Sequence, residues 1–156
     1  MKIGIISDTH GFLHPRVHEI FAGVSHILHG GDIGYDEIIF ELETIAPVTA
    51  VLGNNDIGMR YRETEVILLA GRKFLIHHIL VPRAPHSGIR QRIADEKPDV
   101  VVFGHSHQQH HEIIDGVRYV NPGYSGRPRF RLERSVAVLH CEDAGMRVEF
   151  HPLGAG

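Results

Sequence analysis

The sequence predicts an α/β fold, an αββα sandwich in which two stacked sheets of mixed parallel and antiparallel strands carry helices on their outer faces. Three observations support this prediction. Short apolar runs alternate with helical patterns through the first two-thirds, the last third consists of hairpin signals, and a polar cluster follows most of the apolar runs. The 156 residues are enough for one compact core, so we expect a single domain over residues 1–156.

The first two-thirds of the chain predicts buried strands separated by helices. Helical patterns begin at Pro15, follow an apolar stripe from Ile38 to Ile45, and cover residues 89–96. Because strands and helices alternate here, the strands are expected to be largely parallel at the centre of a sheet. The expected strands are the apolar runs at residues 2–7, 26–29, 48–52, 73–76 and 100–103.

The rest of the strand signal is antiparallel. Two apolar runs that flank a short turn containing glycine are typical of a β-hairpin. The chain has three such pairs: residues 65–69 with 72–76, residues 112–114 with 117–120, and residues 136–140 with 147–150.

Composition narrows the class of partner. The formal net charge of −3, with both signs interspersed, gives no strong signal for nucleic-acid binding. No apolar segment is long enough to cross a membrane or to act as a signal peptide. Cys141 is the only cysteine, which excludes an internal disulfide and favours a cytoplasmic location. A homo-oligomer is compatible with these features.

Metal chemistry is indicated by the 14 histidines and by where the polar residues fall. Taken alone, each polar cluster has a structural explanation as a helix cap, a turn or a buried histidine. Together they place carboxylates, imidazoles and amides at the carboxyl ends of several expected strands, where open α/β sheets form their sites. The clusters are Asp8-Thr9-His10-Gly11, Gly30-Gly31-Asp32, Gly53-Asn54-Asn55-Asp56, His77-His78, Gly104-His105-Ser106-His107 and Asn121-Pro122-Gly123.

The order of these motifs, D-x-H, GD, GN-x-D, H and GH-x-H, resembles the calcineurin-like metallophosphoesterases. The similarity is greatest to the small bacterial and archaeal phosphodiesterases that share a fold with a retromer scaffold subunit, and it extends from Lys2 to about Pro152. The resemblance implies two divalent metal ions bridged by Asp32. One ion would be held by Asp8, His10, Asp32 and His107, and the other by Asp32, Asn54, His77 and His105.

The resemblance further implies a phosphodiesterase that uses metal-activated hydroxide on a phosphate-ester substrate. Two ions would polarise a phosphoryl oxygen and lower the pKa of a bound water. Mixed nitrogen and oxygen ligands suit Mn²⁺, which the resemblance puts first, or Ni²⁺, Fe²⁺, Co²⁺ and Zn²⁺. The alternatives are a phosphomonoesterase with the same mechanism and a weakly active or inactive scaffold protein.

Three positions depart from the family pattern. Asn55 occupies the place of a histidine that contacts the reacting phosphate, and an amide cannot deliver a proton at neutral pH. His78 follows His77 where glycine is common, so it either substitutes as the catalytic acid or crowds the site. Tyr124 replaces a common serine and either narrows the pocket or supplies a stacking ring.

Two further features keep alternative explanations. His29 lies close enough to the Gly30-Gly31-Asp32 motif to support a ligand, and it could equally be packed in the core. The one local cluster of positive charge either protects an exposed edge or meets an anionic substrate. This cluster consists of Arg127, Arg129, Arg131 and Arg134.

Overall fold

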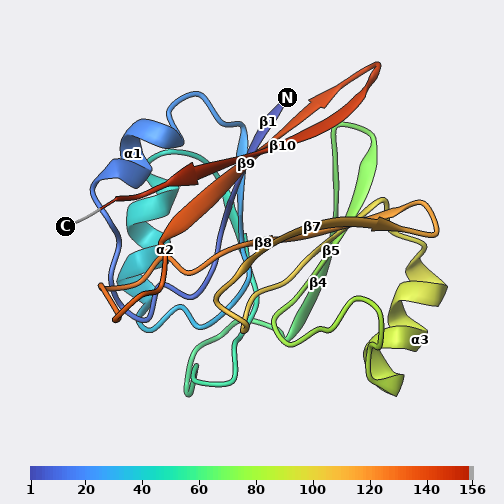
Figure 1. Cartoon of the computed structure of the whole chain (residues 1–156), viewed down its shortest axis with the longest axis horizontal. Helices are drawn as coiled ribbons and strands as arrows, with labels where there is room; N and C mark the ends of the chain where they lie inside the picture. Colours follow the sequence, from blue (N-terminus) through green and yellow to red (C-terminus); the bar gives the residue numbers. More distant parts are fainter. Residues whose placement is uncertain (155–156) are drawn as a thin grey trace.

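The computed structural model describes residues 1–154 and contains two five-stranded sheets (Figure 1). The first sheet joins the two ends of the chain, because the last two strands pair beside the first one. Its strand order is β10 (Gly145–Pro152), β9 (Ser135–Glu142), β1 (Lys2–Ile6), β2 (His26–His29) and β3 (Val48–Ala50).

The second sheet contains the middle of the chain. Its order is β4 (Thr64–Leu69), β5 (Arg72–His77), β6 (Val100–Val102), β8 (Val117–Pro122) and β7 (Gln109–Ile114). All three predicted hairpins are confirmed: β4 pairs with β5, β7 with β8, and β9 with β10. The pairs among β1, β2 and β3, and among β5, β6 and β8, are parallel.

The layers follow from the alternation of side chains along each strand. On β1, Ile3 and Ile5 pack between the sheets, whereas Ile6 faces the helices α1 (Arg16–Ile20) and α2 (Asp36–Glu43). On β5, Leu75 faces α3 (Ser87–Glu96), which covers the second sheet. In Figure 1 the two helices α1 and α2 lie on one side of the molecule and α3 on the other. The predicted αββα arrangement is therefore confirmed.

This topology determines where the polar clusters meet. Parallel neighbours end at the same edge of a sheet, so the segments after β1 and β2 are adjacent, and so are those after β5 and β6. The two sheets then bring these segments together. Among residues 1–154, no helix is long and apolar enough to span a membrane.

Candidate metal centre

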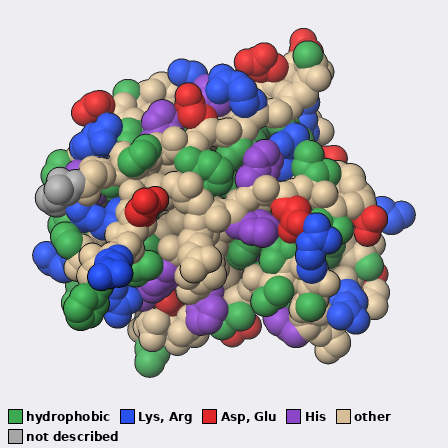
Figure 2. All heavy atoms as spheres, viewed as in Figure 1, with side chains coloured by type: hydrophobic (Ala, Val, Ile, Leu, Met, Phe, Trp, Pro, Cys, Tyr) green, Lys and Arg blue, Asp and Glu red, His purple; other side chains and the backbone are tan. Residues whose placement is uncertain are grey.

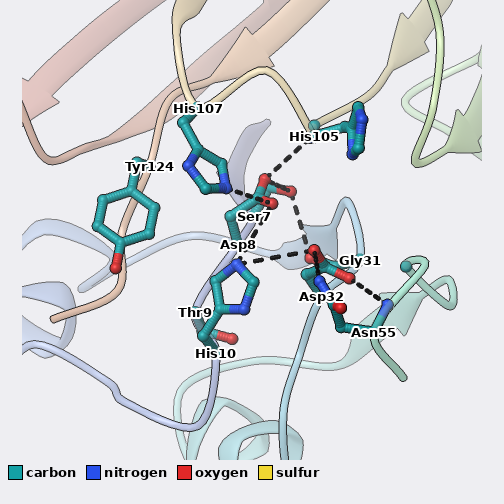
Figure 3. Close-up of polar contacts among 12 residues, drawn as sticks. Ser7, Asp8, Thr9, His10, Gly31, Asp32, Asn55, His105, His107 and Tyr124 are labelled. Carbon is teal, nitrogen blue, oxygen red and sulfur yellow. Dashed lines mark hydrogen bonds and ion pairs between the residues drawn. The ribbon is translucent and has the colours of Figure 1, made fainter. Parts of the chain in front are cut away.

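Two carboxylates form the floor of a site between the two sheets. Asp8 follows β1 and Asp32 follows β2, and their exposed fractions are 0% and 2%. Figure 3 shows the rings of His10 and His107 directed at these carboxylates. Nε2 of His107 lies 3.3 Å from Oδ1 of Asp8, and Nε2 of His10 lies 3.6 Å from Oδ2 of Asp32.

Two groups of potential metal ligands overlap at Asp8. Within the described part of the chain, one group contains Asp8, His10 and His107, and the other contains Asp8, Asp32 and His78. Three ligand atoms of these groups, Oδ1 of Asp8 and Nε2 of His10 and His78, are buried without a hydrogen-bond partner in the described structure. A buried polar atom without a partner costs free energy, so several such atoms in one cluster fit a site for cations.

The surroundings of Asp32 favour its ionised form. The backbone N–H of Asn55 donates to its Oδ1 at 2.9 Å, and the side-chain amide of Asn55 donates to its Oδ2 at 3.0 Å. Burial alone would raise the pKa of Asp32, but the adjacent imidazole of His78 and the hydrogen bonds from Asn55 lower it below its usual range. Asn55 thus holds the carboxylate in place.

Two motif glycines are required by the close approach of these carboxylates. A Cβ atom on Gly53 would lie 2.1 Å from Oδ1 of Asp32, and one on Gly104 would lie 2.6 Å from Oδ2 of Asp8. Both distances are shorter than any allowed contact. The glycines of GN-x-D and GH-x-H therefore let the loops pack directly on the carboxylates.

The backbone at the site is held in an uncommon conformation. Left-handed φ angles are rare for residues with a side chain and persist where the surroundings fix them, frequently at functional sites. Five of the proposed ligands have positive φ: Asp8 (56°), His10 (46°), Asp32 (55°), His105 (71°) and His107 (62°).

The two neighbouring histidines at the end of β5, His77 as its last residue and His78 directly after it, have different surroundings. Nδ1 of His78 donates to the carbonyl of Gly30 at 2.7 Å, which leaves Nε2 free to face Oδ2 of Asp32 at 3.3 Å. Nδ1 of His77 instead contacts the hydroxyl of Thr64 at 2.8 Å, and His77 belongs to neither ligand group. The motif pattern predicted His77 as the ligand, but the structure brings His78 to the carboxylates.

The electrostatics at His78 favour a positive charge. Burial alone would lower the pKa of His78, but the Asp32 carboxylate, 3.3 Å from its Nε2, and the charge of Asp8 raise it above the usual value. A cation is thus stabilised at this point, either as a proton on Nε2 or as a metal ion beside it. Burial lowers the pKa of His77, and the neighbouring His86 lowers it further.

The remaining predicted residues come from both sheets: Asn54 lies in the segment after β3, and His105 lies in the segment after β6. The side-chain oxygen of Asn54 lies 3.2 Å from Nδ1 of His105, close to the roughly 3 Å between neighbouring donor atoms when metal–ligand bonds are about 2.1 Å long. The backbone N–H of His105 donates to Oδ2 of Asp8 at 3.1 Å. The structure therefore brings Asn54 and His105 together beside the carboxylates.

Three further residues support the site: His29, for which the sequence left ligand support and core packing open, and Asp56 and Asn121, which were not assigned a role from the sequence. Nε2 of His29 donates to Thr9, and its Nδ1 accepts from the N–H of Gly31, so it connects the segments after β1 and β2. Burial lowers the pKa of His29 to about 4. Asp56 accepts from three backbone N–H groups, those of Ile33, Gly34 and Gly53, and Asn121 donates to Gly104 and Ser106. Both belong to sequence motifs, which was the available signal.

The sequence belongs to a known family. A profile of the calcineurin-like phosphoesterase superfamily domain matches residues 1–144, so the chain is a member of that superfamily. A probable metallophosphoesterase from Methanothermobacter thermautotrophicus is 33% identical over 163 residues, covering 99% of this chain and 94% of the relative. A phosphodiesterase from Methanocaldococcus jannaschii is 32% identical over 140 residues, covering 79% and 83%.

Solved structures agree on the fold. A predicted phosphoesterase from Streptococcus pneumoniae has a TM-score of 0.78 at 23% identity and covers 97% of this chain and 89% of its own. Vps29 from Entamoeba histolytica, complexed with Zn²⁺, has a TM-score of 0.75 at 22% identity, covering 99% and 100%. An archaeal phosphodiesterase has a TM-score of 0.72 at 26% identity, covering 97% and 100%.

Proposed function

We propose that this protein is a phosphodiesterase that hydrolyses its substrate at a dinuclear metal centre. The family membership supports a metallophosphoesterase, and both the sequence relatives and the solved structures that it resembles include an archaeal phosphodiesterase. The observation that carries the proposal is the cluster of buried potential metal-ligand atoms on Asp8, His10 and His78 that have no hydrogen-bond partner in the described structure.

The ligand set differs from the sequence-based prediction at one residue. Asp32 would bridge the ions, a role supported by the position of its Oδ2, 3.6 Å from Nε2 of His10 and 3.3 Å from Nε2 of His78. His78 would take the ligand role first given to His77. One ion would be held by Asp8, His10, Asp32 and His107, and the other by Asp32, Asn54, His78 and His105.

In the proposed reaction, the main task of the protein is to bind the metal ions and the substrate and to hold the ligands in position. When bound, the ions polarise a phosphoryl oxygen and make a bound water more acidic. Asn55 holds the Asp32 carboxylate by two hydrogen bonds and has no proton to give at neutral pH. With His78 committed to the carboxylates, neither acid candidate from the sequence donates a proton to the leaving group. Esters whose leaving groups need no proton are therefore the favoured substrates.

The experiment is a metal-reconstituted activity screen. The metal-free protein is loaded with Mn²⁺, Ni²⁺, Fe²⁺, Co²⁺ or Zn²⁺, and turnover of bis(p-nitrophenyl) phosphate and of p-nitrophenyl phosphate is compared with the metal content of each sample. We expect two ions per chain, the highest rate with Mn²⁺, and the diester to be hydrolysed faster than the monoester. No bound metal and no turnover would favour a scaffold protein on this fold.

A further inference from the structure

A loop with three arginines lies beside the candidate metal centre. We call residues 127–131 the arginine loop; it connects β8 to β9 and carries Arg127, Arg129 and Arg131. Arg134, at the end of the loop, is only 6% exposed and donates to the carbonyls of Gly126 and Gly154. Arg134 therefore has a structural role, which separates it from the three arginines of the loop.

The loop is fixed next to a proposed metal ligand. The hydroxyl of Tyr124 donates to the carbonyl of Arg127 at 2.8 Å, while the ring of Tyr124 lies 4.7 Å from the ring of His107. The guanidinium of Arg129 lies 5.9 Å from the centre of the Tyr124 ring. Figure 3 shows Tyr124 beside His107, with its hydroxyl turned away from the carboxylates. Tyr124 thus connects the metal centre to the arginine loop.

A second stacking contact holds the first residue of the loop. The guanidinium of Arg127 lies 4.9 Å from the centre of the Phe12 ring, and Phe12 follows the proposed ligand His10 by two residues. Stacking on an aromatic ring restricts a guanidinium while leaving its N–H groups free for an anion. Both stacked arginines are therefore oriented near segments that carry metal ligands.

A cavity of about 270 Å³ connects the two regions. It is lined by His107, Gln108, Gln109, Arg131, Leu132 and Glu133, so one wall belongs to the metal centre and another to the arginine loop. Glu133 is its one carboxylate. A substrate that binds a phosphate at His107 can thus extend a neighbouring group along this cavity towards Arg131.

The loop arginines have no acidic partners of their own. Among residues 1–154, no ion pair or side-chain hydrogen bond includes the guanidinium groups of Arg127, Arg129 or Arg131, whereas Arg83 pairs with Glu112. In Figure 2, several Lys and Arg side chains lie on the side of the molecule that carries the orange loop of Figure 1, and others are spread over the rest of this face. Uncommitted guanidinium groups are well suited to phosphate, which they bind through two parallel hydrogen bonds.

We propose that the arginine loop binds a second phosphate group of the substrate, next to the phosphodiester at the metal centre. This inference rests on the proposed function and names its substrate class: phosphodiesters of a nucleoside that carries a further phosphate. A nucleoside bisphosphate ester and a short single strand both have this chemistry. Phe130, fully exposed between two of the arginines, offers a ring on which a base of a strand could stack.

The test compares two esters that break at the same bond. One is the p-nitrophenyl ester of thymidine 5′-phosphate, and the other is the same ester with an added 3′-phosphate. We expect the 3′-phosphate to lower KM by roughly tenfold with little change in kcat, because it adds binding remote from the reacting bond. Either variant, Arg129→Ala or Arg131→Ala, should remove most of this preference, and Arg131→Lys should keep part of it.

Arg147→Ala is the matched control, because it removes one exposed arginine at the opposite end of the first sheet. Arg147 pairs in register with His140, which also pairs with Lys2 at the start of β1. The control should keep the preference. Equal KM values for the two esters, or a preference that survives both alanine variants, would overturn the proposal. Extending the ester by one nucleotide distinguishes the sources: a further gain that Phe130→Ala reverses indicates a single strand, and no gain indicates a bisphosphate.

A failure of the proposed function gives a different result. If neither ester is hydrolysed, the metal-loaded protein is titrated calorimetrically with thymidine 3′,5′-bisphosphate and with thymidine 5′-phosphate. Tighter binding of the bisphosphate that Arg131→Ala abolishes supports the loop without catalysis. Equal affinity for the two nucleotides excludes the second phosphate site.

Discussion

The two sheets contribute to the metal centre in different ways. The first sheet supplies Asp8 and Asp32, which are buried and receive hydrogen bonds from their surroundings. The second sheet supplies His105, which is exposed, and His107, whose side chain is 19% exposed. His78 is the exception, because its bond to the carbonyl of Gly30 crosses to the first sheet. Hydrogen bonds within the protein thus hold the carboxylates in place, whereas the imidazoles of His105 and His107 are more exposed, and we expect an ion to order them further.

The largest effect should follow from removing the bridging carboxylate. In the proposed dinuclear centre, loss of Asp32 would leave the repulsion between the two ions uncompensated, so Asp32→Ala should lower the bound metal towards one or zero ions per chain and reduce kcat/KM by roughly 10³-fold or more. His107→Ala, which removes a ligand from the second sheet, should cost less. Metal content and rate are measured on the same samples. Two tightly bound ions and normal turnover in Asp32→Ala would show that the bridging assignment is wrong.

A smaller effect should separate the neighbouring histidines. His78→Gln removes the imidazole that faces Asp32 at 3.3 Å and should reduce metal affinity by roughly 10–100-fold. His77→Gln is the matched control, because it changes an adjacent histidine that contacts Thr64 instead. Titration of the metal-free proteins with Mn²⁺ measures both. Equal losses of metal affinity in the two variants would contradict the assignment of His78, and not His77, as the ligand.

The same pair of histidines shows how far the sequence could predict the site. The order of the motifs identified which loops converge, and the structure does bring those loops together. Successive side chains of a strand point to opposite faces, so uncertainty of one residue in where β5 ends exchanges His77 and His78. The bond from His78 to Gly30 spans 48 residues, and no local pattern encodes it.

The fold was more predictable than the site because its signals are local. Turn residues and alternating apolar positions indicated all three hairpins, and Pro15 indicated the start of α1. Local signals could not predict which parallel strands belong to the first sheet and which to the second. It depends on the side-by-side packing of β6 and β8, which are separated along the chain by β7. Such long-range choices are made by packing of the whole core.

The free energy of unfolding of the protein should depend on pH through His29. The pKa of this buried imidazole is lowered to about 4, whereas in the unfolded chain it is near 6.5, so the unfolded state binds more protons between these values. The contribution of His29 is complete above about pH 6.5 and is lost as the pH falls towards 4, by about 3 kcal/mol in total.

Urea unfolding of the metal-free protein at several pH values between 7.5 and 5 measures this effect. His29→Gln is the control, because it keeps a donor and an acceptor but does not titrate. The variant should be less stable at pH 7.5 and should lose about 2 kcal/mol less than the native protein on acidification to pH 5. Parallel pH profiles for the two proteins would contradict a buried neutral His29.

The smallest expected effect concerns the leaving group and Asn55. Aryl oxides leave without a proton, whereas alkoxides need one, and general acid catalysis contributes on the order of 10²–10⁴ in rate where it operates. Asn55 donates only to Asp32, so the native protein should show a steep fall in kcat/KM as the pKa of the leaving group rises. Asn55→His should raise kcat/KM for esters with basic leaving groups by roughly tenfold. This gain is smaller than that of a complete acid, because the substitution also removes the hydrogen bond from the Asn55 side-chain amide to Asp32.

A series of aryl and alkyl diesters measures the slope for both proteins, with His78→Ala as the comparison. A shallow native slope that His78→Ala makes steep would assign the acid role to His78 and remove it from the ligand set.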